Sequence, residues 1–228
     1  MLGRLSTIIS MLLNDIITLA SDDTKSLSSL LRKCLVLAHQ INNERLKDWA
    51  NQELNGYAGS QELPEYRIVS ADSKKTVAGP FGSGSSHWPL PSISVKGNDR
   101  QREEEICLTE AVSVYESLIK AAEAIKSESP RFETPTEIFT YYRRKYAPSL
   151  RGRVLVGAGQ EVPESALIGV LENVRTRTVN IAFEIRRELG DKDEDLGRMT
   201  PDKAARIEQK VIHILHGGTN TIASGSPE

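Results

Sequence analysis

Hydrophobic residues recur at steps of three and four along the first part of the chain, and this pattern constrains the fold most. It predicts three helices, whose apolar stripes run over Leu5–Leu19, Leu27–Ile41 and Leu46–Leu54. The polar breaks between them are Ser21–Thr24, which offers several N-cap oxygens, and Asn42–Asn43. Gly56 stands where a left-handed residue would end the third helix. Because links this short make successive helices antiparallel, the pattern predicts a helical bundle.

Glycine and proline interrupt the helical pattern between residues 58 and 100. Tyr66, Ile68 and Ser70 alternate with Arg67 and Val69, and Asp72–Lys75 offers a turn back into Lys75–Ala78. We therefore expect a small β-hairpin here. The stretch Gly79–Gly97 carries few signals for a helix or a strand, and loops of that length in compact domains are usually functional or mobile.

Helical patterning resumes at Gln101 and continues to about Ser127. Thr134–Glu137 combines a capping box with a proline at the first helical position, which predicts the start of another helix. Arg153–Val156 is a short strand candidate and Gly157–Val162 a tight turn. Pro163 opens the longest predicted helix, and Gly190 closes it. The expected fold class is mainly α, a helical bundle with a small β-hairpin insertion and a β-prone C-terminal tail.

These patterns divide the chain into parts. Residues 1–190 form a helical domain, with a three-helix unit at 1–57, a loop and hairpin insertion at 58–100, and long helices at 101–190. Residues 191–228 comprise an acidic linker, a short helix starting at Thr200–Pro201, and a β-prone tail rich in Gly, Ser and Asn. Since the tail has no core of its own, it can either pair with a sheet edge, for example on a partner chain, or stay mobile. The expected tail interface is Ile212, Ile214, Asn220 and Ile222.

Charge and composition narrow the class of protein. Lys and Arg total 29 against 31 Asp and Glu, a net charge of −2, so nucleic-acid binding would require a local patch. The chain has no long uncharged apolar run and no secretory signal, so we expect a cytoplasmic protein without membrane contact. Cys34 and Cys107 show no metal or redox spacing and are expected to be buried, reduced thiols in helices.

No motif announces catalysis or a cofactor. Gly157–Val162 lacks the third glycine of the dinucleotide fingerprint. Gly79–Gly84 lacks the Lys-Ser/Thr end of a phosphate-binding loop and a helix after it. His213 and His216 are three residues apart and would point to opposite faces of a strand. We expect no catalytic residues, no cofactor and no metal site.

A basic segment is the one candidate for nucleic-acid binding. Five cations fall within eleven residues, from Arg143 to Arg153, with tyrosines beside them. Cations of this kind contact phosphates while tyrosines stack on bases. The alternative, which we favour, is a solvated helix face whose tyrosines belong to the core. The candidate patch comprises Tyr142, Arg143, Arg144, Lys145, Tyr146, Arg151 and Arg153.

Several motifs occur together in a fixed order. They are Leu30–Lys33, Trp49, Glu53–Tyr57, Leu63–Arg67 and Gly79–Gly84, followed by the helical segment Leu171–Leu189. This set resembles the AbiTii family, whose domains are associated with bacterial abortive-infection (anti-phage) systems, and the resemblance covers roughly residues 5–190. It implies a setting in phage defence and no established reaction or catalytic residues.

The motifs that carry the resemblance supply candidate interaction or structural residues. These are Trp49, Gly56, Tyr57, Pro64, Tyr66, Arg67, Gly79, Phe81, Gly82 and Gly84. We expect Arg67 to form a buried pair with a helix carboxylate such as Glu53.

Taken together, the residues and the resemblance predict a non-enzymatic interaction or oligomerisation module of an anti-phage system. It would form a homo-oligomer or bind a protein partner through its C-terminal tail. Two alternatives stay open, a nucleic-acid-binding sensor or effector that uses the basic patch at 143–153, and a cryptic nuclease or nucleotide hydrolase.

Overall fold

The structure is a computed structural model, and it describes residues 2–57, 63–79, 85–88, 105–125, 131–133, 140, 143–144, 153–190 and 200–216. The chain divides into two compact units. The helical unit comprises Met1–Tyr66, Thr109–Glu116 and Val170–Glu228, and the sheet unit comprises Arg67–Leu108 and Ser117–Gly169. The mainly α class with a small β insertion, expected from the sequence, is confirmed.

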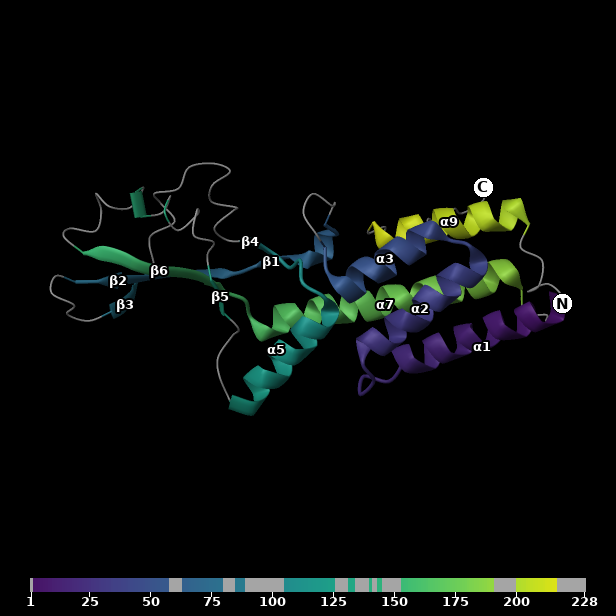
Figure 1. The fold of residues 1–228 in the computed structure, drawn as a ribbon, viewed down its shortest axis with the longest axis horizontal. Helices are drawn as coiled ribbons and strands as arrows, with labels where there is room; N and C mark the ends of the chain where they lie inside the picture. Colours follow the sequence, from purple (N-terminus) through teal and green to yellow (C-terminus); the bar gives the residue numbers. More distant parts are fainter. Residues whose placement is uncertain are drawn as a thin grey trace, which may run out of the picture. The chain divides into compact units, whose positions relative to one another are not determined.

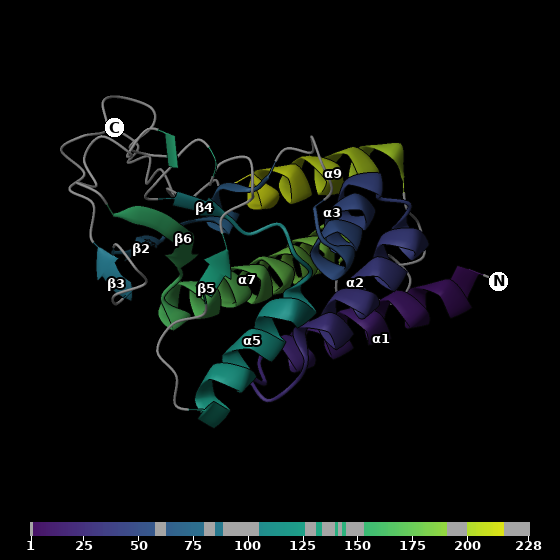
Figure 2. The same ribbon diagram turned by 60° about the vertical axis from the view of Figure 1, so that its left-hand side comes forward.

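The helices are α1 (Leu2–Ala20), α2 (Leu27–Ile41), α3 (Glu44–Asn55), α5 (Val112–Ile125), α7 (Glu164–Leu189) and α9 (Pro201–Leu215). The three predicted N-terminal helices are thereby confirmed. Figure 1 and the turned view in Figure 2 both place α2 between α1 and α3, with α9 next to α3. Gly190 ends α7 with a positive φ of 87°, and the Thr200 side chain caps α9 by accepting from the Lys203 backbone N–H at 3.3 Å, as the sequence predicts.

One hydrophobic core holds the helical unit together. The apolar stripes of α1, α2, α3, α7 and α9 converge in it, with Ile16, Leu31, Leu46, Val174 and Val211 all completely buried. Each side chain of this size contributes about 1.5–3 kcal/mol when it is fully removed from water. The helical spacing of the sequence therefore determines which face of each helix is buried.

Gly56 ends α3 in a conformation that only glycine adopts readily. Its φ is 90° and its ψ 165°, so the backbone is extended with positive φ rather than left-handed helical as expected. A Cβ at this position would lie 2.9 Å from the carbonyl oxygen of Thr109. The next residue, Tyr57, donates its backbone N–H to that same oxygen at 2.7 Å. The glycine thus permits a close approach of two backbone segments.

The described residues of the sheet unit form two antiparallel sheets. Strands β1 (Ile68–Ser70) and β4 (Glu105–Cys107) pair with each other. The other sheet has the order β3-β2-β6-β5, formed by β2 (Asp72–Ala78), β3 (Ser85–Trp88), β5 (Arg131–Glu133) and β6 (Val154–Glu161). Its register shifts between Thr76 and Val77, which pair with Gly157 and Leu155, so Val156 is an extra residue in a β-bulge.

The predicted hairpin is wrong in its pairing. β2 begins at Asp72, where a turn was expected, and it pairs with β3 and β6 instead of with β1. Residues Gly157–Glu161 continue strand β6 rather than forming a turn. β1 and β2 also gain partners from distant parts of the chain, since β1 pairs with β4 and β2 with β6. Local turn propensity carries no information about such pairing.

Two further segments differ from the expectation. Glu105–Cys107 is a strand rather than part of a helix, and Cys107 is exposed. The β-prone segment Val211–Leu215 is helical, as the last part of α9. The reason lies in the spacing: Ile207, Val211 and Leu215 are four residues apart and are all buried in the helical unit's core. Burial of that face outweighs the modest strand preference of β-branched residues.

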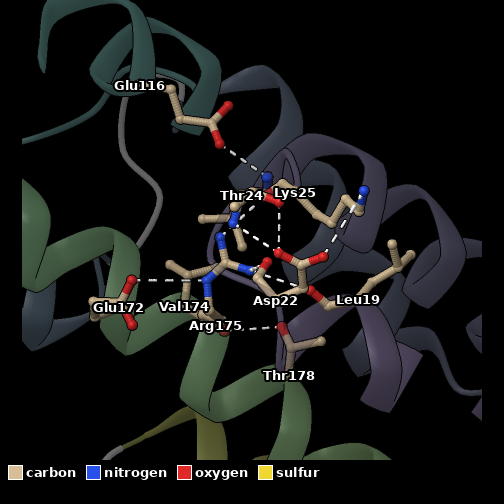
Figure 3. A network of polar contacts seen from close by, with 10 residues as sticks. Leu19, Asp22, Thr24, Lys25, Glu116, Glu172, Val174, Arg175 and Thr178 are labelled. Atoms are coloured by element: carbon tan, nitrogen blue, oxygen red, sulfur yellow. Dashed lines mark hydrogen bonds and ion pairs between the residues drawn. The ribbon is translucent and has the colours of Figure 1, made fainter. Parts of the chain in front are cut away.

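Two charged side chains hold the connection between α1 and α2. Arg175 of α7 donates from Nη1 to the carbonyl oxygens of Leu19 and Asp22, both at 3.3 Å, and from Nη2 to that of Lys25 at 3.1 Å. Glu116 of α5 accepts the Leu27 backbone N–H at 2.9 Å, at the start of α2 (Figure 3). We call this set the Arg175 clamp. It adds side-chain partners to backbone groups of a helix end and a turn, where the Leu19 and Asp22 carbonyl oxygens also accept the backbone N–H groups of Asp22 and Lys25.

Within the clamp, the turn has its own local hydrogen bonds. Asp22 Oδ1 accepts the backbone N–H of Thr24 at 3.0 Å and its hydroxyl at 2.6 Å. These hydrogen bonds favour the ionised carboxylate and hold the pKa of Asp22 below its ordinary value. The sequence predicted capping oxygens in Ser21–Thr24, but the residue at the N-cap of α2 is Ser26, whose side chain forms no cap hydrogen bond.

Replacing Arg175 should destabilise the helical unit. We expect Arg175→Ala to lower the free energy of unfolding by about 2–4 kcal/mol, because three backbone carbonyl oxygens lose a charged donor that is itself buried. Arg175→Lys should recover little of this, since a point charge cannot reproduce the planar fork. Urea denaturation measures both. Arg187→Ala is the matched control on the same helix, since its side chain is 63% exposed; equal unfolding midpoints for Arg175→Ala and this control would contradict the clamp.

The two cysteines should react very differently. Cys34 is buried in the core, and burial raises the pKa of its thiol to about 12, whereas Cys107 is exposed. Because the thiolate is the reactive form, a thiol reagent at pH 8 should modify one cysteine in the native protein and both in urea. Cys107→Ser should abolish the native reaction. Rapid native modification of the Cys107→Ser variant would show that Cys34 is accessible.

Candidate functional site

A completely buried carboxylate organises the C-terminal part of α3. Glu53 Oε1 accepts hydrogen bonds from the hydroxyls of Tyr57 at 2.6 Å and Tyr66 at 2.7 Å. The Tyr66 hydroxyl in turn accepts the indole N–H of Trp49 at 2.9 Å. Trp49 and Glu53 are four residues apart and so share a face of the helix. We call Trp49, Glu53, Tyr57 and Tyr66 the tyrosine–carboxylate cluster.

The cluster fixes the protonation of Tyr66 and the position of a cation. Burial, followed by the negative charge of Glu53, raises the pKa of the Tyr66 phenol well above its ordinary value, so the hydroxyl stays a donor. The guanidinium carbon of Arg177, on α7, lies 4.5 Å from the centroid of the Tyr66 ring. This is a cation–π contact, and it places Arg177 beside the cluster.

Next to the cluster, the helical unit has a cavity of about 360 Å³. Its floor consists of side chains that are apolar or half-buried, and its rim consists of polar side chains that are exposed. The floor consists of Trp49, Gln52, Leu63, Pro64, Arg177, Ile212 and Leu215, and the rim consists of Arg45, Asp48, Glu65 and His216. We call this cavity the α3–α9 pocket. Its volume lies in the range of pockets that bind small molecules or single side chains.

The polar side chains of the α3–α9 pocket make few contacts within the protein. Among the described residues, the side chains of Arg45, Asp48, Gln52, Glu65 and His216 form no hydrogen bond or ion pair. Charged residues elsewhere on the same helices do pair, for example Lys47 with Glu44 at 2.8 Å and Arg206 with Glu188 at 2.7 Å. The pocket therefore gathers donors and acceptors that are available to a ligand.

Several residues singled out from the sequence meet at this pocket. Trp49 and Pro64 line it, and Tyr57 and Tyr66 belong to the adjacent cluster. Gly56 ends α3, and Gly79 is half-buried just after β2. Phe81, Gly82 and Gly84 lie outside the described residues.

Arg67 is a buried structural residue of the sheet unit. Its side chain is completely buried, and its Nη1 donates to the carbonyl oxygen of Leu108 at 2.8 Å. The Leu108 backbone N–H returns a hydrogen bond to the Arg67 carbonyl oxygen at 2.8 Å. The burial agrees with the expectation, and the pair of Arg67 with Glu53 stays a prediction.

The other two candidate surfaces fall largely outside the described residues. In the basic patch, Arg143, Arg144 and Arg153 are exposed, whereas Tyr142, Lys145, Tyr146 and Arg151 are not described. In the tail interface, Asn220 and Ile222 are not described, and Ile212 and Ile214 lie on helix α9 rather than on a strand. Ile212 lines the α3–α9 pocket and Ile214 packs against the core.

Sequence reasoning missed the charged members of the pocket. Arg45, Asp48 and Arg177 lie on helices where charged residues are ordinary, and nothing in their spacing marks them as functional. Within the part of the chain that the structure describes, no group of three His, Cys, Asp or Glu residues could hold a metal ion. Nor is any helix in that part long and apolar enough to cross a membrane.

Removing the Tyr66 hydroxyl should lower the free energy of unfolding at neutral pH and reduce the further loss of stability at alkaline pH. Tyr66→Phe keeps the ring under Arg177 but leaves Glu53 and Trp49 each one partner short, so we expect a loss of about 1–3 kcal/mol. The pKa of the Tyr66 phenol is higher in the folded state than the unfolded value of 10.0. Its contribution to the free energy of unfolding is therefore full below pH 10.0 and is lost as the pH rises further. Urea denaturation at pH 7 and pH 10.5 measures both effects. An equal alkaline loss in wild type and Tyr66→Phe would contradict this assignment.

Comparison with known proteins agrees with the resemblance seen in the sequence. The AbiTii family matches residues 11–211, which is most of the chain and includes every residue of the α3–α9 pocket except Ile212, Leu215 and His216. No curated protein and no solved structure matches the chain. The family is associated with abortive infection, a bacterial defence against phage. By the extent of this match, the chain belongs to the AbiTii family.

Proposed function

We propose that this protein acts in anti-phage defence as a non-enzymatic interaction module, and that the α3–α9 pocket is its binding surface. The observation that carries the proposal is the arrangement of the pocket, an apolar floor surrounded by polar side chains without partners among the described residues. Protein interfaces have this anatomy, with a buried apolar centre and a polar rim. The floor also contains Trp49 and Arg177, two residue types that are frequent among the strongest contributors to binding.

The buried charges of the helical unit support binding rather than chemistry. The Glu53 carboxylate is held by two tyrosine hydroxyls, and the Arg175 guanidinium by three backbone carbonyls. Neither Glu53 nor Arg175 lines the α3–α9 pocket, so both stabilise the scaffold around it. The scaffold in turn keeps the pocket walls in place.

The partner is a second copy of the chain or a separate protein, bound through the C-terminal region. Ile212 and Leu215 of α9 form part of the pocket floor, so this region contributes directly to the proposed surface. The contact is thus made by a helix packed on α3, in place of strand pairing by residues 211–215.

Reversing the charge of the rim arginine should abolish defence without unfolding the protein. In a phage-challenged host, we expect Arg45→Glu to raise plaque counts to those of cells without the protein, because this exposed side chain lies at the pocket and has no partner among the described residues. Light scattering after size exclusion should show the same variant losing its self-association or its co-purified partner. Unchanged circular dichroism and thermal midpoints would confirm that the fold is kept.

The matched control is Lys120→Glu, which makes the same charge change at an exposed position outside the pocket. It should protect the host as the wild type does. Full protection by the rim variant would refute the proposal. Loss of protection on reversing Arg143 and Arg144, with the rim variant still active, would instead favour the nucleic-acid-binding candidate.

A further inference from the structure

We propose that the α3–α9 pocket binds a peptide carboxylate that lies next to an apolar side chain, and that Arg177 is the group that binds the carboxylate. This inference rests on the proposed function, because it names the ligand chemistry of the same pocket. It is carried by the environment of Arg177, by the composition of the pocket floor and by the charges on the rim.

Arg177 is held in a defined position before any ligand binds. Its guanidinium lies 4.5 Å from the centroid of the Tyr66 ring, and Tyr66 is itself fixed through hydrogen bonds with Glu53 and Trp49. Nη1 of Arg177 also donates to Asn173 Oδ1, at 3.4 Å. A guanidinium that is ordered in advance loses little conformational entropy on binding, which favours affinity.

The charge of Arg177 has no anionic partner among the described residues. Its one hydrogen bond there goes to the neutral amide of Asn173, and its Nε is buried without a partner. By contrast, Arg187, further along the same helix, forms an ion pair with Glu184 at 2.6 Å. A half-buried guanidinium with unused N–H groups binds a carboxylate strongly, because the planar fork matches the two oxygens.

The floor explains why the carboxylate should adjoin an apolar side chain. Leu63, Pro64, Ile212 and Leu215 face the same cavity as Arg177. A cavity of about 360 Å³ has room for a leucine-sized side chain together with a carboxylate. Burial of the apolar group supplies affinity, and the carboxylate supplies specificity.

The rim favours a singly charged carboxylate over a phosphate. Asp48 and Glu65 are exposed on the rim and would repel a dianion, while the exposed Arg45 and His216 provide cationic or donor groups. Charges in water are screened more strongly than half-buried charges. Arg177 lies deeper and therefore determines that the ligand is an anion. The acidic side chains of the rim limit how much negative charge that ligand carries.

Three small probes test the proposal on the full chain. N-acetyl-leucine presents a chain-end carboxylate, N-acetyl-leucyl-aspartic amide presents a side-chain carboxylate, and N-acetyl-leucinamide has the apolar group alone. NMR titration follows the indole N–H signal of Trp49, which lines the pocket and is assigned with a Trp88→Phe variant. At least one acid should bind saturably and about tenfold or more tightly than the amide, as a charge-assisted hydrogen bond requires.

The acid that binds better identifies the source of the carboxylate, a chain terminus or an Asp or Glu side chain. Arg177→Gln should weaken that binding about tenfold or more and leave the amide's binding unchanged. Arg187→Gln is the matched control on α7 and should bind as the wild type does. Equal binding of acid and amide, or unchanged acid binding by Arg177→Gln, would overturn the proposal.

A second variant keeps the test valid if Arg177→Gln fails to fold. Asp48→Asn/Glu65→Gln changes only exposed rim side chains and should tighten acid binding about two- to threefold by removing repulsion. Weaker or unchanged acid binding would count against the proposal. If the wild type binds the acid but the rim-reversed variant still protects the host, the proposed function is refuted and the carboxylate proposal stands. If the rim-reversed variant loses protection but the wild type does not bind the acid, only the carboxylate proposal is refuted.

Discussion

Burial of the Glu53 carboxylate is the constraint on which the pocket region depends. A carboxylate with no exposed surface is tolerated only when hydrogen-bond donors surround it, and two of those donors are the hydroxyls of Tyr57 and Tyr66. Meeting this requirement fixes Tyr66, whose ring then contacts Arg177 and whose hydroxyl contacts Trp49. Both of those residues line the α3–α9 pocket, so a structural requirement also determines the shape of the binding surface.

Helix α7 distributes two arginines between scaffold and pocket. Arg175 and Arg177 are two residues apart, so their side chains leave the helix on nearly opposite faces. Arg175 binds the backbone carbonyls of the α1–α2 connection, while Arg177 lies over Tyr66 beside the pocket. The same residue type therefore serves stability at one position and recognition at the other, and the difference lies in the partners that tertiary structure supplies.

Most of the residues that line the pocket lie within the part of the chain that matches the AbiTii family. The family match ends at residue 211, within α9, and covers α3 and Arg177. Of the motifs that resemble the family, Trp49 and Pro64 line the pocket, and Glu53, Tyr57 and Tyr66 belong to the cluster beside it. These five residues thus form one structural feature, in which a buried network supports a surface cavity.

The sequence by itself determined much of the helical unit, because apolar spacing and caps are local. Neighbouring residues specify the stripes of α1, α2 and α3, the end of α7 at Gly190 and the start of α9 at Thr200. Tertiary structure decided the rest. Strand partners can lie far apart in sequence, so β1 joined β4 and β2 joined β6. Core burial made Val211–Leu215 helical. The pocket itself arises only where α3, Leu63–Glu65, α7 and α9 come together, and residues as ordinary in sequence as Asp48 and Arg177 become a site through that proximity.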